Sequence, residues 1–516
     1  MKIILRCLLA VSTIAQFAIA QAPIAEAFAP DRRAVSNSPF YPVQALLNDL
    51  LRADGSAAEV FEPDPRDGLV DMPAAKDIYI AVRTDAPAPA GDECAAQGGS
   101  GTPMDPCDGS TQAKFDAIMR RQPESAAVHL GSGIFSTNGV HGWSLLRGMK
   151  ILGEGTVRTT LKQVFVPLAD GYNFGVISGR DSSGPDGTDG DNVEIAGLTI
   201  DCNYDALQPL TVAAIGHDTT NASIYGVVGR SGLIRNIRVI HAGGNLETFC
   251  IGLMAQGPSS NLPAARYSHA PLRSEIRDCV VELPSAIHHS LSAIIVFAGF
   301  FEAPFDGSSK DVIPYGGAGF IRDCRVDGGP YGGTFAPTMG IAYGGAGFNR
   351  LLIEHCYARN AVLGFYHDTG PQRNLEIAHC LFEGVSIGIR HFGGARQEAS
   401  YGHYHHNTII SFDSGISLCA ANNTVVEENS LWRVTGATLD PATAFIFQQF
   451  NDDLTVNLEN NVFRYNHVDE NFCHAEIERG NPQVYGNRYF DGARIDELPD
   501  NAGDSSPPAT VASGRR

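Results

Sequence analysis

Lysine is scarce in this chain of 516 residues, and its scarcity limits what the protein can bind. Only Lys310 occurs after Lys162, no stretch is rich in lysine or arginine, and the formal net charge is −20. Binding of nucleic acid requires a basic surface, so the composition argues against a nucleic-acid partner. Nearly all positive charge in the second half of the chain must therefore come from arginine or from a bound metal.

Long apolar segments are also missing, apart from one at the N-terminus. Two basic residues precede an apolar run over residues 8–19, and Ala18 and Ala20 form a small-x-small cleavage site. This pattern is typical of a secretory signal peptide, and it predicts a secreted or periplasmic protein cleaved near Ala20. An uncleaved anchor is the alternative, which the shortness of the run disfavours. No other run approaches the length of a transmembrane helix.

Cysteine pairs with metal-binding spacing are absent as well. None of the eleven cysteines lies in a Cys-x-x-Cys pair, which argues against a cysteine-based zinc site. Cys94 and Cys107 lie in a loop rich in glycine and proline. In an oxidising compartment we expect them to form a disulfide, with two free thiols as the alternative.

The sequence does contain a six-residue pattern that recurs ten times between residues 195 and 489. Each copy has an apolar residue, two mostly polar residues, a Cys, Asn, Leu or Ile, any residue, and a further apolar residue. Apolar residues two apart indicate strands, and a recurrence of this kind indicates a solenoid whose coils bury a common core. The copies begin at Ile195, Ile234, Ile276, Ile321, Ile353, Ile377, Tyr404, Val426, Leu458 and Val484.

The fourth position of the pattern is expected to form one column inside the solenoid. Parallel strands lie about 4.8 Å apart, so like side chains at one position repeat their contacts from coil to coil. Cysteines in such a column are expected to be buried, reduced thiols. The predicted column consists of Cys279, Cys324, Cys356 and Cys380, followed by Asn407, Asn429, Asn461 and Asn487.

A second strand, opened by glycine, follows the column residue in three of the copies, as at residues 364–367. Together with residues 353–358, this segment resembles the repeat of the right-handed parallel β-helix proteins of the pectin-lyase-like superfamily. The resemblance covers roughly residues 110–490, and it implies an all-β, right-handed parallel β-helix. That superfamily includes polysaccharide lyases, glycoside hydrolases, esterases, epimerases and non-catalytic surface proteins, so the resemblance selects no activity.

An amphipathic helix is expected before the first coil, over residues 111–121. Phe115, Ile118 and Met119 share one face, and Asp108 or Ser110 is the expected N-terminal cap. Such a helix would cover the open apolar end of the solenoid.

The chain is expected to divide into four parts. The last of them is rich in proline, serine and aspartate and is expected to be disordered. The parts are a signal peptide (1–20), an N-terminal arm (21–75), the β-helix with its capping helix (76–490) and the tail (491–516).

The candidate catalytic residues lie on the strands that glycine opens. Strand alternation points Tyr366, Asp368 and Arg390 outward, whereas His367 and His391 fall on the inward phase. The resemblance favours this face, because in the family the corresponding sheet commonly lines the substrate groove. A solvated sheet face with a local ion pair is the alternative.

Long insertions beside this face carry aromatic residues that could stack on sugar rings, or simply pack against the solenoid. They cover residues 257–273, 299–316 and 328–339.

Three histidines, His355, His379 and His406, directly precede column residues and suggest a transition-metal site. Ligands from one edge of one sheet rarely enclose an ion, so the preferred interpretation is a column of surface histidines without a metal.

A calcium site is a second possibility for a metal. Asp186, Asp189 and Asp191 in a glycine-rich loop are candidate calcium ligands, although they lack the spacing of an EF-hand. A solvated turn is the alternative and is preferred.

Three functions remain open. A lyase would break a uronate-containing glycan by β-elimination, with Arg390 neutralising charge or abstracting a proton and Tyr366 as proton donor or base. In similar β-helix lyases arginine or lysine does this work, often with calcium. A glycoside hydrolase would need two carboxylates flanking the bond, of which only Asp368 is evident. The third function is non-catalytic glycan binding. We expect a polysaccharide-active enzyme, with the lyase ahead of the hydrolase, and a polysaccharide or oligosaccharide as its partner.

Overall fold

The structure is a computed structural model, and it describes most of the chain between residues 74 and 495. All of the described residues belong to one compact unit, Arg66–Arg516. The segments left out of the description are 1–73, 140–141, 165–173, 179–191, 204–205, 207–222, 230–231, 245–247, 256–272, 284–290, 299–317, 330–338, 345–349, 369–374, 393–401, 420, 422, 435–441, 449–459, 478–481 and 496–516.

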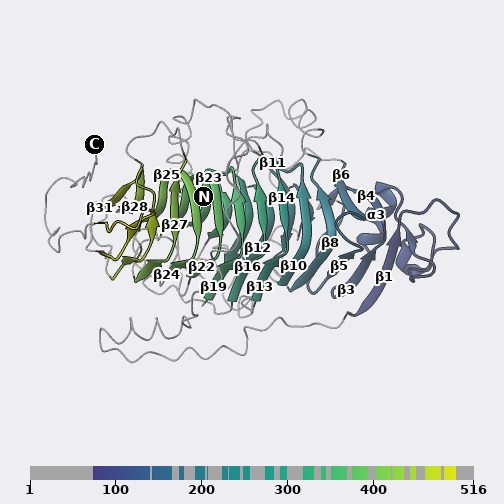
Figure 1. Cartoon of the computed structure of the whole chain (residues 1–516). Helices are drawn as coiled ribbons and strands as arrows, with labels where there is room; N and C mark the ends of the chain where they lie inside the picture. Colours follow the sequence, from purple (N-terminus) through teal and green to yellow (C-terminus); the bar gives the residue numbers. More distant parts are fainter. Residues whose placement is uncertain are drawn as a thin grey trace, which may run out of the picture. The chain divides into compact units, whose positions relative to one another are not determined.

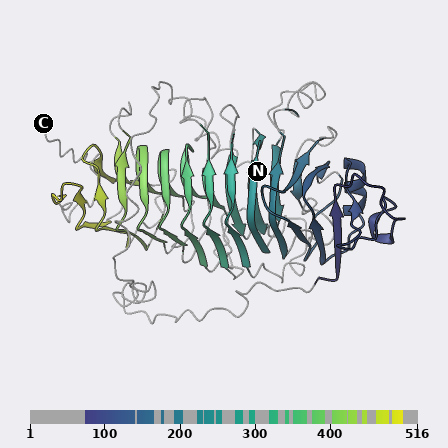
Figure 2. The same cartoon turned by 45° about the vertical axis from the view of Figure 1, so that its right-hand side comes forward.

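The coils stack into three parallel sheets, and successive coils add strands to each (Figures 1 and 2). The first sheet ends at the bend before the column residue, the second follows that bend, and the third contains the strands opened by glycine.

The first sheet consists of β1 (Lys76–Ala81), β3 (Ala126–Leu130), β5 (Lys150–Gly153), the first parts of β8 (Val193–Asp201) and β10 (Gly232–Ile240), β13 (Arg273–Arg277), β16 (Ala318–Arg322), β19 (Arg350–Glu354), β22 (Leu375–Ala378), β24 (Gly402–His405), β26 (Thr424–Glu427), β29 (Val462–Arg464) and β32 (Gln483–Tyr485). The second consists of β4 (Gly133–Thr137), β6 (Thr159–Gln163), the later parts of β8 and β10, β14 (Val280–Glu282), β17 (Arg325–Asp327), β20 (Tyr357–Arg359), the first parts of β23 (Leu381–Phe392) and β25 (Thr408–Cys419), β27 (Ser430–Arg433), β30 (His467–Val468) and β33 (Arg488–Tyr489). The third consists of β7 (Phe174–Ser178), β9 (Ser223–Gly229), β12 (Thr248–Ala255), β15 (Leu291–Ala298), β18 (Met339–Gly344), β21 (Leu363–Asp368), the later parts of β23 and β25, β28 (Thr443–Gln448) and β31 (Cys473–Ile477). Outside these series lie β2 (Cys107–Asp108), which pairs with β1, and β11 (Gly243–Gly244), which pairs with β9.

Strand pairing keeps one register from coil to coil. Ile276 pairs with Ile321, Ile321 with Ile353, and Ile353 with Ile377, and all four side chains are fully buried. Among the described strands every pairing is parallel except that of β11 with β9. Parallel strands joined by such crossovers are right-handed in nearly all proteins. The prediction of an all-β, right-handed parallel β-helix is confirmed.

Each coil bends sharply at the residue before the column position. His355, His379 and His406 have φ values of 53°, 54° and 54°, and Asn236 occupies the same position with φ 50°. These values lie in the left-handed region, which asparagine, aspartate, histidine and glycine adopt more readily than other residues. The histidine column seen in the sequence is therefore a column of bend residues.

The buried column is confirmed for seven of its eight predicted members, and Asn461 is the exception. Cys279, Cys324, Cys356 and Cys380 are buried, reduced thiols. Asn407 and Asn429 continue the column, because the Asn407 backbone N–H donates to Asn429 Oδ1 at 3.0 Å. The last two coils, which contain Asn461 and Asn487, differ from the prediction at one position.

Asn466, and not Asn461, lies on the column. The Asn429 N–H donates to Asn466 Oδ1 at 3.0 Å, and the Asn466 N–H donates to Asn487 Oδ1 at 2.9 Å. Asn461 lies elsewhere on the coil, where its Oδ1 accepts from the Thr424 N–H. The prediction was wrong because two Asn–apolar patterns lie five residues apart.

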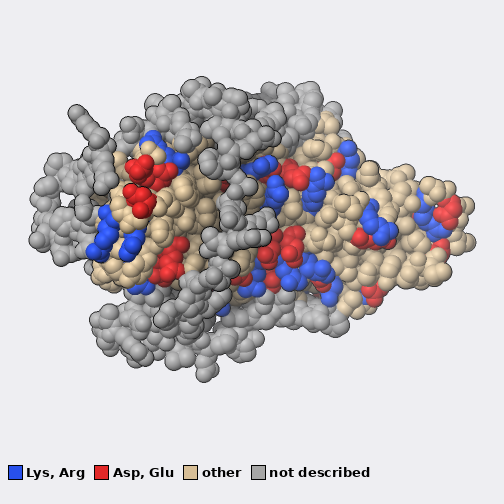
Figure 3. All heavy atoms as spheres, viewed as in Figure 1, with Lys and Arg blue, Asp and Glu red and all other residues tan. Residues whose placement is uncertain are grey.

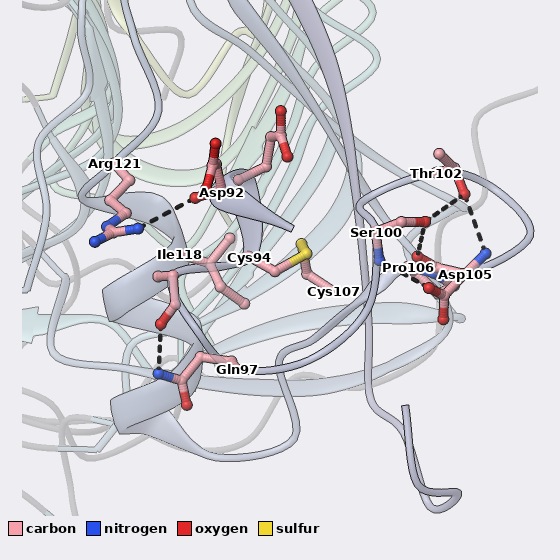
Figure 4. Close-up of a disulfide and its surroundings, with 12 residues drawn as sticks. Asp92, Cys94, Gln97, Ser100, Thr102, Asp105, Pro106, Cys107, Ile118 and Arg121 are labelled. Carbon is pink, nitrogen blue, oxygen red and sulfur yellow. Dashed lines mark hydrogen bonds between the residues drawn. A yellow bond between two sulfur atoms is a disulfide. The ribbon is translucent and has the colours of Figure 1, made fainter. Parts of the chain in front are cut away.

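The predicted disulfide between Cys94 and Cys107 is present (Figure 4). It ties the short 3-10 helix η2 (Asp92–Cys94) to β2 at the first coils. Arg121 Nη1 donates to the carbonyl oxygen of Asp92 at 3.2 Å and links this loop to the end of the capping helix.

The predicted capping helix is α3 (Gln112–Met119), and Phe115, Ile118 and Met119 are buried on its inner face. The N-cap is Thr111, whose hydroxyl accepts from the Lys114 N–H, so the predicted caps Asp108 and Ser110 were wrong. The Asp108 carboxylate instead accepts from Lys114 Nζ at 2.5 Å and from the Ser110 N–H at 3.0 Å. It therefore lies beside the first turn of the helix and does not cap it.

Charges of opposite sign alternate on the outer surface of the coils (Figure 3). Arg235 pairs with Glu194 of the preceding coil at 3.0 Å, and Arg322 pairs with Glu354 of the following coil at 2.9 Å. Ion pairs between coils at these positions mix the two signs of charge, as expected from a chain without basic runs.

Several predictions concern residues that the structure does not describe. They include the signal peptide, the N-terminal arm up to residue 73, and the tail from residue 496. At the C-terminal end, packed structure extends at least to Ile495, which is buried. Of the helices that the structure describes, none is long and apolar enough to cross a membrane.

Candidate functional site

The outward column on the third sheet contains the residues expected to face a substrate. In register, Tyr366 pairs with Arg390, Arg390 with Ser417, and the column continues through Ile446 to Glu476. The predicted alignment of Tyr366 and Arg390 on neighbouring coils is thus present. Arg390 is half-buried, and Tyr366 is only 8% exposed, so this tyrosine is less open to solvent than expected for an outward residue.

Asp368 and the long insertions complete the predicted face only in part. The backbone of Asp368 ends β21, but its side chain lies outside the described part of the structure, as do almost all of the residues of the three aromatic insertions. Their proposed contacts with a glycan therefore stay predictions.

His367 and His391 lie inside the coil, as their inward phase predicted. Both side chains are fully buried, their ring centroids lie 4.5 Å apart, and His391 Nδ1 hydrogen-bonds the Tyr404 hydroxyl. Burial lowers the pKa of His391 to about 3 and holds the pKa of His367 well below its usual range. Both rings are therefore neutral, and neither reaches the outer surface, so we give them no direct contact with a substrate.

Asp413 is a functional candidate that the sequence did not reveal. It lies on a β-bulge in β25, where two residues separate Ser411 from Ser414 but only one separates their partners on β23. Bulges redirect side chains and are frequent beside active sites. This bulge lies at the corner where the chain passes from the second sheet to the third.

Charged residues from three other coils act electrostatically on Asp413. Burial raises the pKa of the Asp413 carboxyl, and Glu476 raises it further, while Arg390 and Arg433 oppose the rise. Perturbed carboxyls of this kind occur preferentially at functional sites. We call Arg390, Asp413, Arg433 and Glu476 the Asp413 cluster.

Two metal sites were considered from the sequence. The calcium candidates Asp186, Asp189 and Asp191 lie outside the described residues, so that site stays a prediction. Two of the three bend histidines, His379 and His406, do approach each other, together with His405 at the end of β24. The sequence pattern missed His405, because it lies on the strand and not at the bend.

Comparison with known proteins adds little to this geometry. No model of a known protein family matches the chain, and no curated protein matches its sequence. Among solved structures, it is similar to the A-module of the Azotobacter vinelandii mannuronan C-5 epimerase AlgE6, with 13% identity, coverage of 74% of this chain and 94% of that one, and a TM-score of 0.38. It is also similar to XylC in complex with xylose, with 11% identity, coverage of 81% of this chain and 84% of that one, and a TM-score of 0.40. A polygalacturonase from Erwinia carotovora is similar as well, with 12% identity, coverage of 64% of this chain and 94% of that one, and a TM-score of 0.33.

At these TM-scores the similarities support no residue role, and the fold rests on the strand pairing described above. The resemblance to the pectin-lyase-like superfamily stands at the level of this coiled architecture.

Proposed function

We propose that the protein is a secreted polysaccharide-active enzyme that cleaves a uronate-containing glycan by β-elimination on the outer face of the third sheet. The observation that carries the proposal is the Asp413 cluster, in which a carboxyl with a raised pKa interacts with two arginines. The short apolar N-terminal segment and the Cys94–Cys107 disulfide both support export to an oxidising compartment.

The chemistry of β-elimination matches this set of side chains. A base removes the proton next to the uronate carboxylate, and electrons shift to form a carbon–carbon double bond. The glycosidic oxygen then leaves and takes a proton from the protonated base or from water. Asp413 in its ionised form is the base, and its raised pKa makes it a stronger one. Arg390 and Arg433 neutralise the substrate carboxylate and the negative charge that develops on it.

A glycoside hydrolase is the second candidate, and the presence of Glu476 favours it. Hydrolysis needs one carboxyl that is protonated and one that is ionised. Asp413, with its raised pKa, fits the acid, and Glu476 provides the second carboxylate that the sequence did not show.

Product analysis separates the two chemistries. The protein is incubated with uronate and neutral glycans, and both reducing ends and the ultraviolet absorbance of unsaturated ends are measured. A lyase produces both signals, whereas a hydrolase produces reducing ends alone. Binding without either signal would make the protein a glycan-binding module and would refute the enzymatic proposal.

The pH profile provides an independent distinction. As a base Asp413 must be ionised, so lyase activity is lost as the pH falls below the raised pKa of this carboxyl. As an acid it must be protonated, so hydrolase activity is lost as the pH rises above the same pKa.

Substitution of Arg390 tests the location of the site. Arg390→Ala should lower kcat/KM by about 100-fold or more if the guanidinium supports developing charge, with little change in Tm. The matched control is Arg325→Ala, which removes an exposed arginine from the second sheet and should leave activity unchanged. Full activity of Arg390→Ala on a substrate that the wild type cleaves would refute this face as the site.

A further inference from the structure

A group of three imidazoles lies on the outside of the first sheet, where β22 and β24 end. One ring nitrogen each from His379, His405 and His406 lies within 4.8 Å of the other two. His379 and His406 are bend residues of successive coils, and His405 is the last residue of β24. The group therefore draws on both a strand end and two bends, so its side chains do not all project along one line.

A small residue leaves room for these rings. By strand register, the neighbour of His405 on β22 is Ala378, whereas the neighbour on the other side is Glu427. Strand alternation points Ala378 to the same outer face, since Ile377 beside it is buried in the core. The methyl group of Ala378 fills little of the space that a longer side chain would occupy.

Two carboxylates determine which nitrogens carry hydrogen. His405 Nε2 lies 3.3 Å from Glu376 Oε1, and His406 Nε2 lies 2.6 Å from Glu428 Oε2. An ionised carboxylate only accepts hydrogen bonds, so each Nε2 carries its hydrogen. In the neutral rings both Nδ1 atoms then present lone pairs, and these two atoms lie 2.8 Å apart. Two lone pairs at this distance repel each other unless a cation, either a proton or a metal ion, lies between them.

We propose that His379, His405 and His406 bind a divalent transition-metal ion such as zinc, with His405 and His406 coordinating through Nδ1. Glu376 and Glu428 would orient these two rings from their far side, an arrangement that is common for metal-bound histidine. With zinc–nitrogen bonds of about 2.0–2.1 Å, tetrahedral ligand nitrogens lie about 3.3 Å apart. This separation falls between the 2.8 Å from His405 Nδ1 to His406 Nδ1 and the 4.8 Å within which all three ring nitrogens lie. Small rotations of the rings are therefore sufficient to reach tetrahedral geometry.

The chemistry of the site favours zinc, nickel or copper over calcium. Three neutral imidazoles are nitrogen donors, which borderline transition metals prefer and calcium does not. All three histidines are half-buried, so solvent can supply the fourth ligand.

Metal titration of the purified protein tests the proposal. After removal of metals with EDTA, Zn²⁺ is titrated by calorimetry, and Co²⁺ is titrated while its visible absorption is recorded. We expect one tight equivalent of Zn²⁺ and intense Co²⁺ bands typical of four-coordinate geometry. Failure of the stripped wild type to bind either ion would overturn the proposal.

The bend positions allow ligand variants that keep the fold. His379→Asn and His406→Asn retain a residue suited to positive φ, as Asn236 shows in an earlier coil. Each should weaken Zn²⁺ binding by more than about 100-fold, because it removes a ligand. Glu428→Gln removes only a carboxylate that orients a ligand, so it should weaken binding by about 10-fold. The matched control is His355→Asn, because His355 stacks on His379 with ring centroids 5.2 Å apart but does not belong to the group.

Two outcomes would contradict the assignment of these ligands. Equal loss of Zn²⁺ affinity in His355→Asn and His406→Asn would place the ion elsewhere, and unchanged affinity in His406→Asn would remove this residue from the site. Chemical footprinting of the wild type needs no variant, since Zn²⁺ should protect His405 and His406 from diethylpyrocarbonate. Unchanged modification of both residues in saturating Zn²⁺ would refute the site even if the variants did not fold.

Discussion

The asparagine ladder provides the sharpest test of what holds the later coils together. Asn429 is fully buried and makes bonds to both neighbouring coils. Its Oδ1 accepts from the backbone N–H and from Nδ2 of Asn407, and its Nδ2 donates to the Tyr404 carbonyl and to Asn466 Oδ1. Asn429→Leu removes all of these bonds and adds an apolar side chain in a polar column.

The expected loss follows from the groups left without partners. Asn407 Nδ2 still donates to the Ile377 carbonyl, and Asn466 Oδ1 still accepts from the backbone N–H of residue 429. The Asn407 backbone N–H and the Tyr404 carbonyl lose the bonds described here. At about 1–3 kcal/mol for each buried unsatisfied group, the free energy of unfolding should fall by about 2–6 kcal/mol.

Urea denaturation followed by circular dichroism measures this loss. Asn471→Leu is the control, because the Asn471 amide is exposed and bonds only Asp469, so its effect should stay within about 0.5 kcal/mol. A loss below about 1 kcal/mol for Asn429→Leu would show that the ladder amides do not stabilise the stack.

Three further predictions concern acid stability and the disulfide. Burial alone would raise the pKa of Glu427, but hydrogen bonds from His403 and Arg464 lower it to about 2, so its contribution to stability is lost as the pH falls from about 4.5. Glu427→Gln should flatten the dependence of the urea midpoint on pH in that range, and an unchanged slope would contradict this. His391, with its pKa lowered to about 3, should destabilise the fold as the pH falls below about 6.5, and His391→Gln should remove this part of the slope; retention of the full slope would contradict it. Cys107→Ser opens a loop with a sequence separation of 13, which should lower stability by about 3 kcal/mol in calorimetry, and an unchanged Tm would refute the estimate.

The coil period and most of the column could be predicted from the sequence, because apolar residues two apart report directly on which side chains face inward. The prediction failed where the sequence offers two equivalent registers. Asn461 and Asn466 are both followed by apolar residues, and only the pairing of Val426 with Phe463 selects Asn466. Register across coils is a property of the folded stack, so a local pattern cannot determine it.

The candidate site could be predicted only along one outward column of the third sheet. Alternation placed Tyr366 and Arg390 on the same column, but it gave no measure of how deeply Tyr366 is buried. Asp413 was missed because its environment depends on Arg433 and Glu476, which come from later coils. The bulge that displaces Asp413 also breaks the alternation on which the sequence argument depended.

The bend before the column residue explains why polar chemistry gathers at one edge of the first sheet. Its positive φ favours asparagine, aspartate, histidine and glycine, although Glu428 and Tyr465 also occupy this position in the later coils. Most of these residues carry polar side chains that can bind a proton or a metal. The next residue is buried and confined to cysteine or asparagine in the later coils, so that position offers no freedom for function. Stacking then places successive bend side chains about 5 Å apart, and any two that share chemistry become neighbours without further change in the fold. The pairing of His379 with His406 is one product of this geometry, and the choice of residue at each bend is therefore where coils of this kind can gain a binding site.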